Sequence, residues 1–294
     1  MRGKHIMFVG DSVSDNHWQS LLCLLQSSVP GSNMITVPNN NTAISTVKFQ
    51  VCMQGYDVWI SVYLTHYLVD IENEKIGRVL NLDSIKAGET WKQADVLIFN
   101  TWLWWYRSGP KQPYVVFNFA KCRWDYIENN GKIVKDMDRM AAFRKGLETW
   151  AKWVQTDVNP SKTKVFFQGI SPFHYHCNKI NYIKFLLIFF MTNDSGKEWN
   201  EPSATNCSNE TTPVNGTTYP GGAPSALTVL KQVLNTNTSP SKPVHLLDIT
   251  LLSQLRKDGH PSKYNGFHGM DCTHWCLAGV PDTWNTILYS ELRS

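Results

Sequence analysis

The beginning of the chain constrains the fold more than any other stretch of the sequence. A short apolar run at residues 5–9 leads directly into Gly10, Asp11 and Ser12, and residues 18–25 then carry apolar side chains at helical spacing. This order predicts a buried strand, a sharp turn and a helix. It is typical of the first unit of a layered α/β fold with a parallel sheet.

Predicted strands and helices continue to alternate along the rest of the chain. Residues 200–224 are rich in Asn, Thr, Ser, Gly and Pro, and we predict that they form loops. No repeat and no interdomain linker stands out, so we expect residues 1–294 to form a single domain with a mostly parallel central sheet. The further predicted elements are strands at 57–63, 94–100, 164–167 and 244–248, and helices at 137–154 and 226–234.

Charge and composition exclude several classes of protein. The net charge is +4 without a basic stripe, so no nucleic acid is expected as a partner. The longest apolar run, at residues 185–191, is far shorter than the roughly 20 residues that span a bilayer. Cys272 and Cys276 form a lone C-x3-C without a second pair, so no metal is predicted. For the 12 Trp residues, we favour core filling over exposed platforms that stack on sugar rings.

Ser12 is the first candidate for chemistry. It follows a predicted buried strand at the start of a helix, which places it at the carboxyl edge of the sheet, where open α/β sheets bind ligands. N–H groups at the start of this helix, together with Gly10 and Asp11, are predicted to surround the oxyanion of an acyl intermediate. For a Gly-Asp-Ser sequence alone, a simple helix cap is the stronger interpretation.

Asp271 and His274 change that balance. A serine nucleophile needs a base within hydrogen-bond reach, and the base needs a carboxylate that orients it. An Asp and a His three residues apart can meet on one turn, which leaves the second ring nitrogen of His274 for Ser12. An early nucleophile combined with a late Asp-x-x-His in an α/β chain predicts a catalytic triad.

Asn100 and His174 are further candidates at the same edge of the sheet. Asn100 ends a predicted strand, and its side-chain N–H₂ is either a second oxyanion donor or part of a turn that ends the strand. His174 follows another predicted strand, and it either contacts substrate or is a loop histidine without a role. The tryptophans at residues 102–105 form either a sugar-stacking wall or part of the core.

Two blocks of the sequence resemble the plant trichome birefringence-like family. Residues 10–12 and 16–25 resemble its GDS block, and residues 271–285 resemble its DxxH block. The likeness extends over nearly the whole chain, from Arg2 to Leu292. It implies a GDSL/SGNH-hydrolase-like three-layer sandwich in which Ser12 is the nucleophile, His274 the base and Asp271 the residue that orients it.

The resemblance also implies a function. Members of this family are polysaccharide O-acetyltransferases of the Golgi, held there by one amino-terminal membrane helix. The chain is therefore expected to take an acetyl group from a donor such as acetyl-CoA, without a bound cofactor, and to pass it to hydroxyls of xylan, mannan or pectin. Contact with a membrane is expected only through an upstream anchor that this sequence does not contain. The alternatives are an acetylesterase with the same triad and a non-catalytic polysaccharide-binding protein.

Cysteines and sequons fit this assignment. The resemblance implies disulfide-bonded cysteines in the DxxH block, with Cys207 as a candidate partner for one of them. Residues 114–123 and about 175–194 are interpreted as insertions relative to the family, each of which adds a cysteine. Six N-x-[ST] sequons favour a glycoprotein of the secretory pathway, where disulfides persist: Asn40, Asn193, Asn206, Asn209, Asn215 and Asn237.

Overall fold

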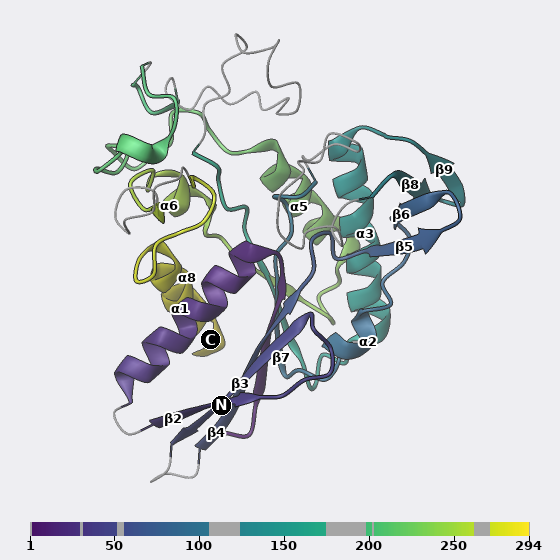
Figure 1. Ribbon diagram of the computed structural model, residues 1–294, viewed down its shortest axis with the longest axis horizontal. Coiled ribbons are helices and arrows are strands. Elements are labelled where there is room, and N and C mark those ends of the chain that lie inside the picture. Colours follow the sequence, from purple (N-terminus) through teal and green to yellow (C-terminus); the bar gives the residue numbers. More distant parts are fainter. Residues whose placement is uncertain are drawn as a thin grey trace.

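A central sheet carries helices on both of its faces (Figure 1). The computed structural model describes residues 2–29, 32–51, 56–105, 124–174, 198–201, 203–261 and 271–293. Within these ranges the sheet has seven strands in the order β11-β10-β7-β1-β4-β3-β2. In chain order they are β1 (His5–Gly10), β2 (Ser32–Val37), β3 (Ile44–Val51), β4 (Tyr56–Leu64), β7 (Val96–Phe99), β10 (Lys164–Gln168) and β11 (Val244–Leu247).

Strand direction defines where a site can form. β11, β10, β7, β1 and β4 are parallel, so their carboxyl ends meet at one edge of the sheet. β3 and β2 continue the sheet beyond β4 in antiparallel pairing. The chain first builds strands on the β4 side of β1 and then returns to pair β7 with its other side. Ligands bind at such a reversal of strand order, which here lies between the carboxyl ends of β1 and β7.

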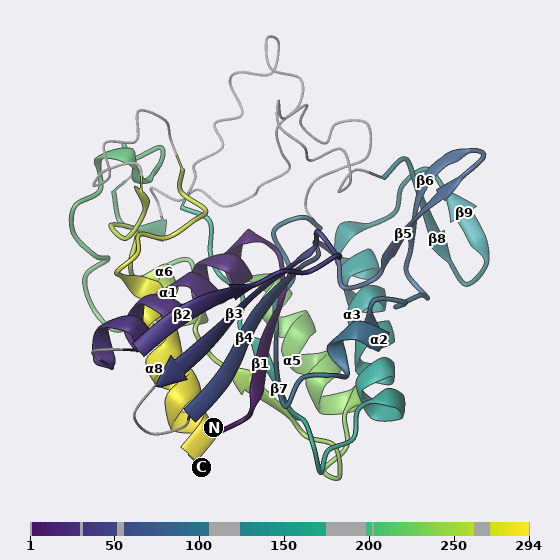
Figure 2. The same cartoon turned by 60° about the horizontal axis from the view of Figure 1, so that its bottom comes forward.

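Alternating side chains of the sheet feed two separate cores. Ile6 and Phe8 of β1 face the layer of α1 (Ser12–Ser28) and α8 (Val280–Arg293), whereas Met7 and Val9 face the opposite layer. That second layer contains α3 (Arg139–Asp157) and α5 (Ser225–Asn237), as Figure 2 shows. Three short helices, which belong to neither pair, are α2 (Gly88–Trp91), the 3₁₀ helix η4 (Cys207–Asn209) and α6 (Thr250–Gln254).

A smaller sheet lies beside the layer of α3 (Figure 2). Its strand order is β5-β6-β8-β9, and β6 and β8 are parallel whereas the other two pairs are antiparallel. Its strands are β5 (Asp70–Glu74), β6 (Gly77–Asn81), β8 (Tyr126–Asn129) and β9 (Lys132–Val134).

The predicted three-layer α/β fold with a mostly parallel central sheet is confirmed. Each strand and helix predicted from apolar runs is present, with ends that differ by a few residues. Two of the strands that the sequence did not reveal are mostly exposed. β2 has four consecutive exposed residues, and β9 is exposed throughout, so neither carries a buried apolar run.

Two further predictions concern the insertions and the length of the apolar runs. The stretches interpreted as insertions, 114–123 and about 175–194, lie outside the described residues, as do the apolar run at 185–191 and the cysteines at 122 and 177. In the part of the chain that the structure describes, no helix has the length and apolar character needed to cross a bilayer.

Candidate active site

Ser12 is the first residue of α1, directly after β1. Asp11 caps this helix, because its Oδ1 accepts a hydrogen bond from the Val13 N–H at 2.9 Å. The turn requires a glycine at position 10, because a Cβ there would lie 2.3 Å from the Asn100 carbonyl oxygen and 2.4 Å from Ser14 Oγ. The sequence Gly-Asp-Ser therefore fixes Ser12 at the carboxyl edge of the sheet.

His274 and Asp271 complete a hydrogen-bond chain that begins at Ser12. The Nδ1–H of His274 donates to Asp271 Oδ2 at 2.7 Å, and its Nε2 lies 2.7 Å from Ser12 Oγ. With the proton on Nδ1, the Ser12 hydroxyl donates to Nε2, which is the arrangement that a general base needs. The structure brings these three side chains together as predicted, although Ser12 and His274 are 262 residues apart in sequence.

The turn at residues 271–274 orients the imidazole. Asp271 Oδ1 accepts the backbone N–H groups of Thr273 and His274, each at 3.0 Å, while its other oxygen accepts the ring N–H. Burial alone would raise the pKa of Asp271, but these hydrogen bonds and the His274 charge together lower it well below its ordinary value. Asp271 therefore stays ionised and can stabilise an imidazolium.

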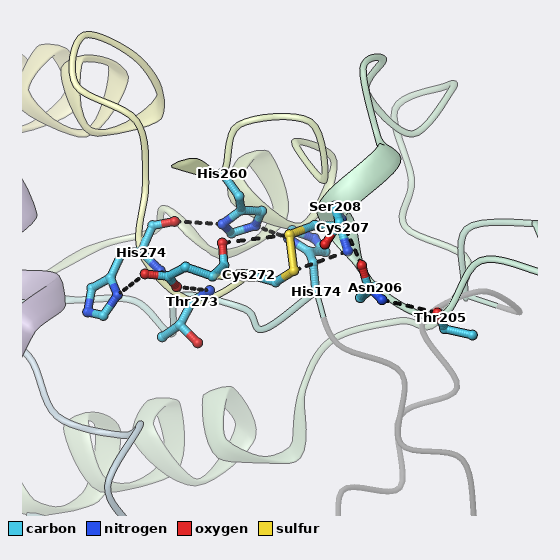
Figure 3. Close-up of a disulfide and its surroundings, with 10 residues drawn as sticks. His174, Thr205, Asn206, Cys207, Ser208, His260, Cys272, Thr273 and His274 are labelled. Carbon is cyan, nitrogen blue, oxygen red and sulfur yellow. Dashed lines mark hydrogen bonds and ion pairs between the residues drawn. A yellow bond between two sulfur atoms is a disulfide. The ribbon is translucent and has the colours of Figure 1, made fainter. Parts of the chain in front are cut away.

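Contacts from distant segments hold this turn in place. Cys272 forms a disulfide with Cys207, a residue 65 positions away that belongs to η4 (Figure 3). The Trp275 N–H donates to Asn16 Oδ1 at 3.0 Å, which joins the turn to the first turns of α1. The disulfide removes Cys272 as a metal ligand, and Cys276 is a free thiol among the described cysteines.

Asn100 follows β7 at the reversal of strand order. Its Nδ2 donates to Asp11 Oδ1 at 2.8 Å, and both side chains are buried. Asp11 thus orients the amide of Asn100 while it caps α1. The predicted role of Asn100 as an oxyanion donor stays a prediction, and so do the roles of Gly10 and Asp11 around the oxyanion.

His174 and the tryptophans near Asn100 do not line the site. The His174 ring is fully buried, with Nε2 3.0 Å from the Gln254 carbonyl oxygen and Nδ1 2.6 Å from His260 Nε2. The predicted contact of His174 with substrate is therefore replaced by contacts with protein groups. The tryptophans at 102, 104 and 105 are buried in the core, as are seven of the other nine tryptophans, so core filling is the correct interpretation.

Comparison with known proteins gives the family. The sequence matches PC-Esterase, the GDSL/SGNH-like acyl-esterase family found in Pmr5 and Cas1p, over residues 1–184 and 177–291. It is 48% identical to the protein trichome birefringence-like 38 of Arabidopsis thaliana over 99% of this chain and 67% of that protein. It is 50% identical to trichome birefringence-like 41 of the same plant over 99% of this chain and 72% of that protein.

The chain belongs to the trichome birefringence-like family. The predicted resemblance is thereby confirmed, and membership of this family and of PC-Esterase supports an enzyme of the esterase or acyl-transfer kind. Trichome birefringence-like 39 of Arabidopsis thaliana, 48% identical over the full chain and 70% of its own length, adds to the same assignment.

Three side chains beside the triad of this trichome birefringence-like chain were given no role at the site by the sequence reasoning. Asn16 lies four residues after Ser12, and this helical spacing was the signal that could have placed it on the side of Ser12. Asp15 interacts electrostatically with His274; burial raises the pKa of its carboxyl, against the hydrogen bond from Gln19 and the His274 charge. His260 carried no signal, because its neighbours in space come from distant segments.

Proposed function

We propose that this trichome birefringence-like chain is an O-acetyltransferase, in which Ser12 receives an acetyl group and passes it to a hydroxyl of a cell-wall polysaccharide such as xylan, mannan or pectin. The observation that carries the proposal is the hydrogen-bond chain from Ser12 Oγ through His274 to Asp271. Membership of an acyl-esterase family supports the same chemistry. The acetyl donor in this proposal is acetyl-CoA.

The first step acetylates the enzyme. Ser12 Oγ attacks the thioester carbonyl carbon while His274 Nε2 accepts the hydroxyl proton, and the ionised Asp271 stabilises the imidazolium. The C–S bond of the tetrahedral intermediate then breaks, and the imidazolium returns its proton to the departing thiolate. The products of this step are an acetyl ester on Ser12 and the free thiol of coenzyme A.

The second step transfers the acetyl group. A sugar hydroxyl gives its proton to His274 as its oxygen attacks the acetyl-Ser12 carbonyl, and the imidazolium then returns a proton to Ser12 Oγ as the ester bond to the enzyme breaks. In both steps the oxyanion needs donors. The Ser12 N–H, which has no intrahelical acceptor at the first position of α1, and the oriented amide of Asn100 are the proposed pair.

An acetylesterase with the same triad is the second candidate. The matched family is named for acyl-esterases, and the His274 side chain is 37% exposed, so water can reach the base. The two activities differ only in which hydroxyl accepts the acetyl group. Release of acetate in the absence of sugar, at a rate equal to or above that of transfer to oligosaccharide, would favour the esterase.

The lumen of the Golgi is the proposed location. The disulfide between Cys207 and Cys272 fits an oxidising compartment. Four sequon asparagines, at positions 40, 209, 215 and 237, are exposed, as glycosylation in the secretory pathway requires.

Acetyl transfer to defined oligosaccharides tests the proposed function. The protein is incubated with acetyl-CoA and with xylo-, manno- or galacturono-oligomers, and acetylated products are identified by mass. Intact-protein mass after acetyl-CoA alone should show one added acetyl group on the wild type and none on Ser12→Ala. Ser27→Ala, an exposed serine on the same helix, serves as the matched control and should behave as the wild type. Equal transfer by Ser12→Ala and the wild type would contradict the proposal.

A further inference from the structure

Two buried histidines lie behind the main chain of His274 (Figure 3). His174 and His260 are no more than 1% exposed, and they come from segments 86 residues apart. Three contacts link them in a row. His174 Nε2 lies 3.0 Å from the Gln254 carbonyl oxygen, His174 Nδ1 lies 2.6 Å from His260 Nε2, and His260 Nδ1 lies 2.6 Å from the His274 carbonyl oxygen.

Counting protons along this row gives its charge. The carbonyl oxygens at the two ends only accept, so His174 Nε2 and His260 Nδ1 must both carry hydrogen. The central nitrogen–nitrogen contact needs a third hydrogen on one ring or the other. Two neutral imidazoles supply only two. The complete row of contacts therefore belongs to a histidine pair that shares one extra proton and carries a positive charge.

Neighbouring groups act on this proton in opposite directions. Burial lowers the pKa of both rings, and the charges of Lys257 and His274 act in the same direction. The carboxylates of Asp271 and Asp258 oppose this at His260, which also stacks on Trp275 with ring centres 4.4 Å apart. The third proton is therefore gained on the acid side of neutrality.

The pair contacts the DxxH turn at two points. His260 donates to the carbonyl of His274, whose imidazole bonds Ser12. The backbone N–H of His174 donates to the carbonyl of Cys272 at 3.0 Å, and its carbonyl accepts the Cys207 N–H at 3.1 Å. The two histidines thus reach the turn on either side of Thr273 and tie it to the disulfide.

We propose that His174 and His260 are positioning residues, which share a proton and hold the main chain of His274 so that its imidazole stays in contact with Ser12. The proposal rests on the proposed function of the triad. It assigns neither histidine a contact with substrate or with the reacting atoms.

Two amide variants at one position separate positioning from simple filling of space. His260→Asn places an N–H₂ near the position of Nδ1 and can still donate to the His274 carbonyl, whereas His260→Gln reaches toward His174 and leaves that carbonyl without its donor. We expect His260→Gln to lower kcat about tenfold with less than about a twofold change in KM, and His260→Asn to keep most of kcat. His245→Asn, on β11 and outside the site, is the control.

Covalent labelling of Ser12 by a fluorophosphonate distinguishes two kinds of failure. If the wild type is neither labelled nor active, the proposed function fails. If the wild type is labelled and active but both His260 variants match it in kcat, the positioning role is overturned. A structural role alone would lower the stability of both variants equally without the difference in kcat between Asn and Gln.

Nuclear magnetic resonance of the wild type tests the shared proton without any substitution. In protein labelled with ¹⁵N-histidine, the ring nitrogens of His174 and His260 should shift together in one transition between about pH 7.5 and about pH 4. Separate transitions for the two rings, or two rings that stay neutral throughout this range, would overturn the sharing of a proton. This measurement holds even if a variant does not fold.

Discussion

Ser12 and His274 are held against each other by two regions that differ in construction. On the helix side, residues 10–14, the backbone itself sets the geometry, because Ser12 is fixed between β1 and the capped start of α1. On the loop side, residues 271–276, no helix or strand is present. Side chains from distant segments position this turn instead, through a disulfide, the histidine pair and Asn16. The nucleophile thus depends on regular structure, and the base depends on individual contacts.

The largest expected effect comes from breaking the loop side at its carboxylate. Asp271→Asn keeps the size of the side chain but cannot stabilise an imidazolium, and it favours the wrong ring tautomer. We expect kcat to fall by about 10⁴, as for the equivalent change in other triads. Acetyl transfer and Ser12 labelling measure the effect, with the exposed Asp136→Asn as control. A loss smaller than about tenfold would show that Asp271 does not orient the base.

Removing the disulfide tests the same region through stability. Replacing Cys207 and Cys272 by serine opens a loop of 65 residues, and chain entropy predicts a loss of about 4 kcal/mol in the free energy of unfolding. Urea unfolding measures it. The matched variant on the helix side is Cys23→Ser, an exposed free cysteine on α1, which should leave both stability and kcat unchanged. Equal effects of the two variants would remove the distinction between the regions.

Acid should weaken the helix side, because it contains a buried histidine that lies outside the histidine pair. His17 beneath α1 has a pKa of about 4, chiefly because burial disfavours the charged ring. The unfolded chain therefore binds more protons between about pH 6.5 and pH 4, so stability is present above this window and falls as the pH drops through it. His17 contributes roughly 3 kcal/mol to the fall. Urea unfolding at several pH values measures the slope, and a stability that does not change across the window would contradict it.

The smallest expected effect lies where the two regions meet. Asn16→Ala removes the acceptor for the Trp275 N–H and leaves helix and turn otherwise intact. We expect a loss of about 1 kcal/mol in the free energy of unfolding and a fall of about tenfold or less in kcat. Gln26→Ala, an exposed residue further along α1, is the control for loss of a polar side chain. A fall in kcat as large as that of Asp271→Asn would mean that the disulfide and the histidine pair do not hold the turn without the contact to Asn16.

The same contrast explains how much the sequence could predict. The helix side was predictable, because an apolar strand, Gly10 and a helical repeat are local patterns that follow from backbone geometry. The triad was predictable because Asp271 and His274 have a spacing that lets their side chains meet on one turn. Within the fold, β2 and β9 were not predictable, since an exposed strand carries no local apolar signal.

His174 shows where sequence reasoning stops. Its position after β10 correctly placed it near the catalytic edge, but the direction of its ring depends on His260 and Gln254, which come from far along the chain. A local pattern cannot tell a histidine that faces substrate from one buried against another histidine. The same holds for the tryptophans beside Asn100, because their burial in the core follows from packing and not from the local sequence.

The separation of 262 residues between Ser12 and His274 has a consequence for folding. α1 can form early during synthesis, but the core beneath it also contains Trp284 and Leu288 of α8, at the other end of the described chain. That face of the sheet stays open to water until nearly the whole polypeptide has emerged, which makes assembly slow and dependent on long-range contacts. The hydroxyl at position 12 gains its base only at the last stage of folding. An incomplete chain therefore has no activated nucleophile.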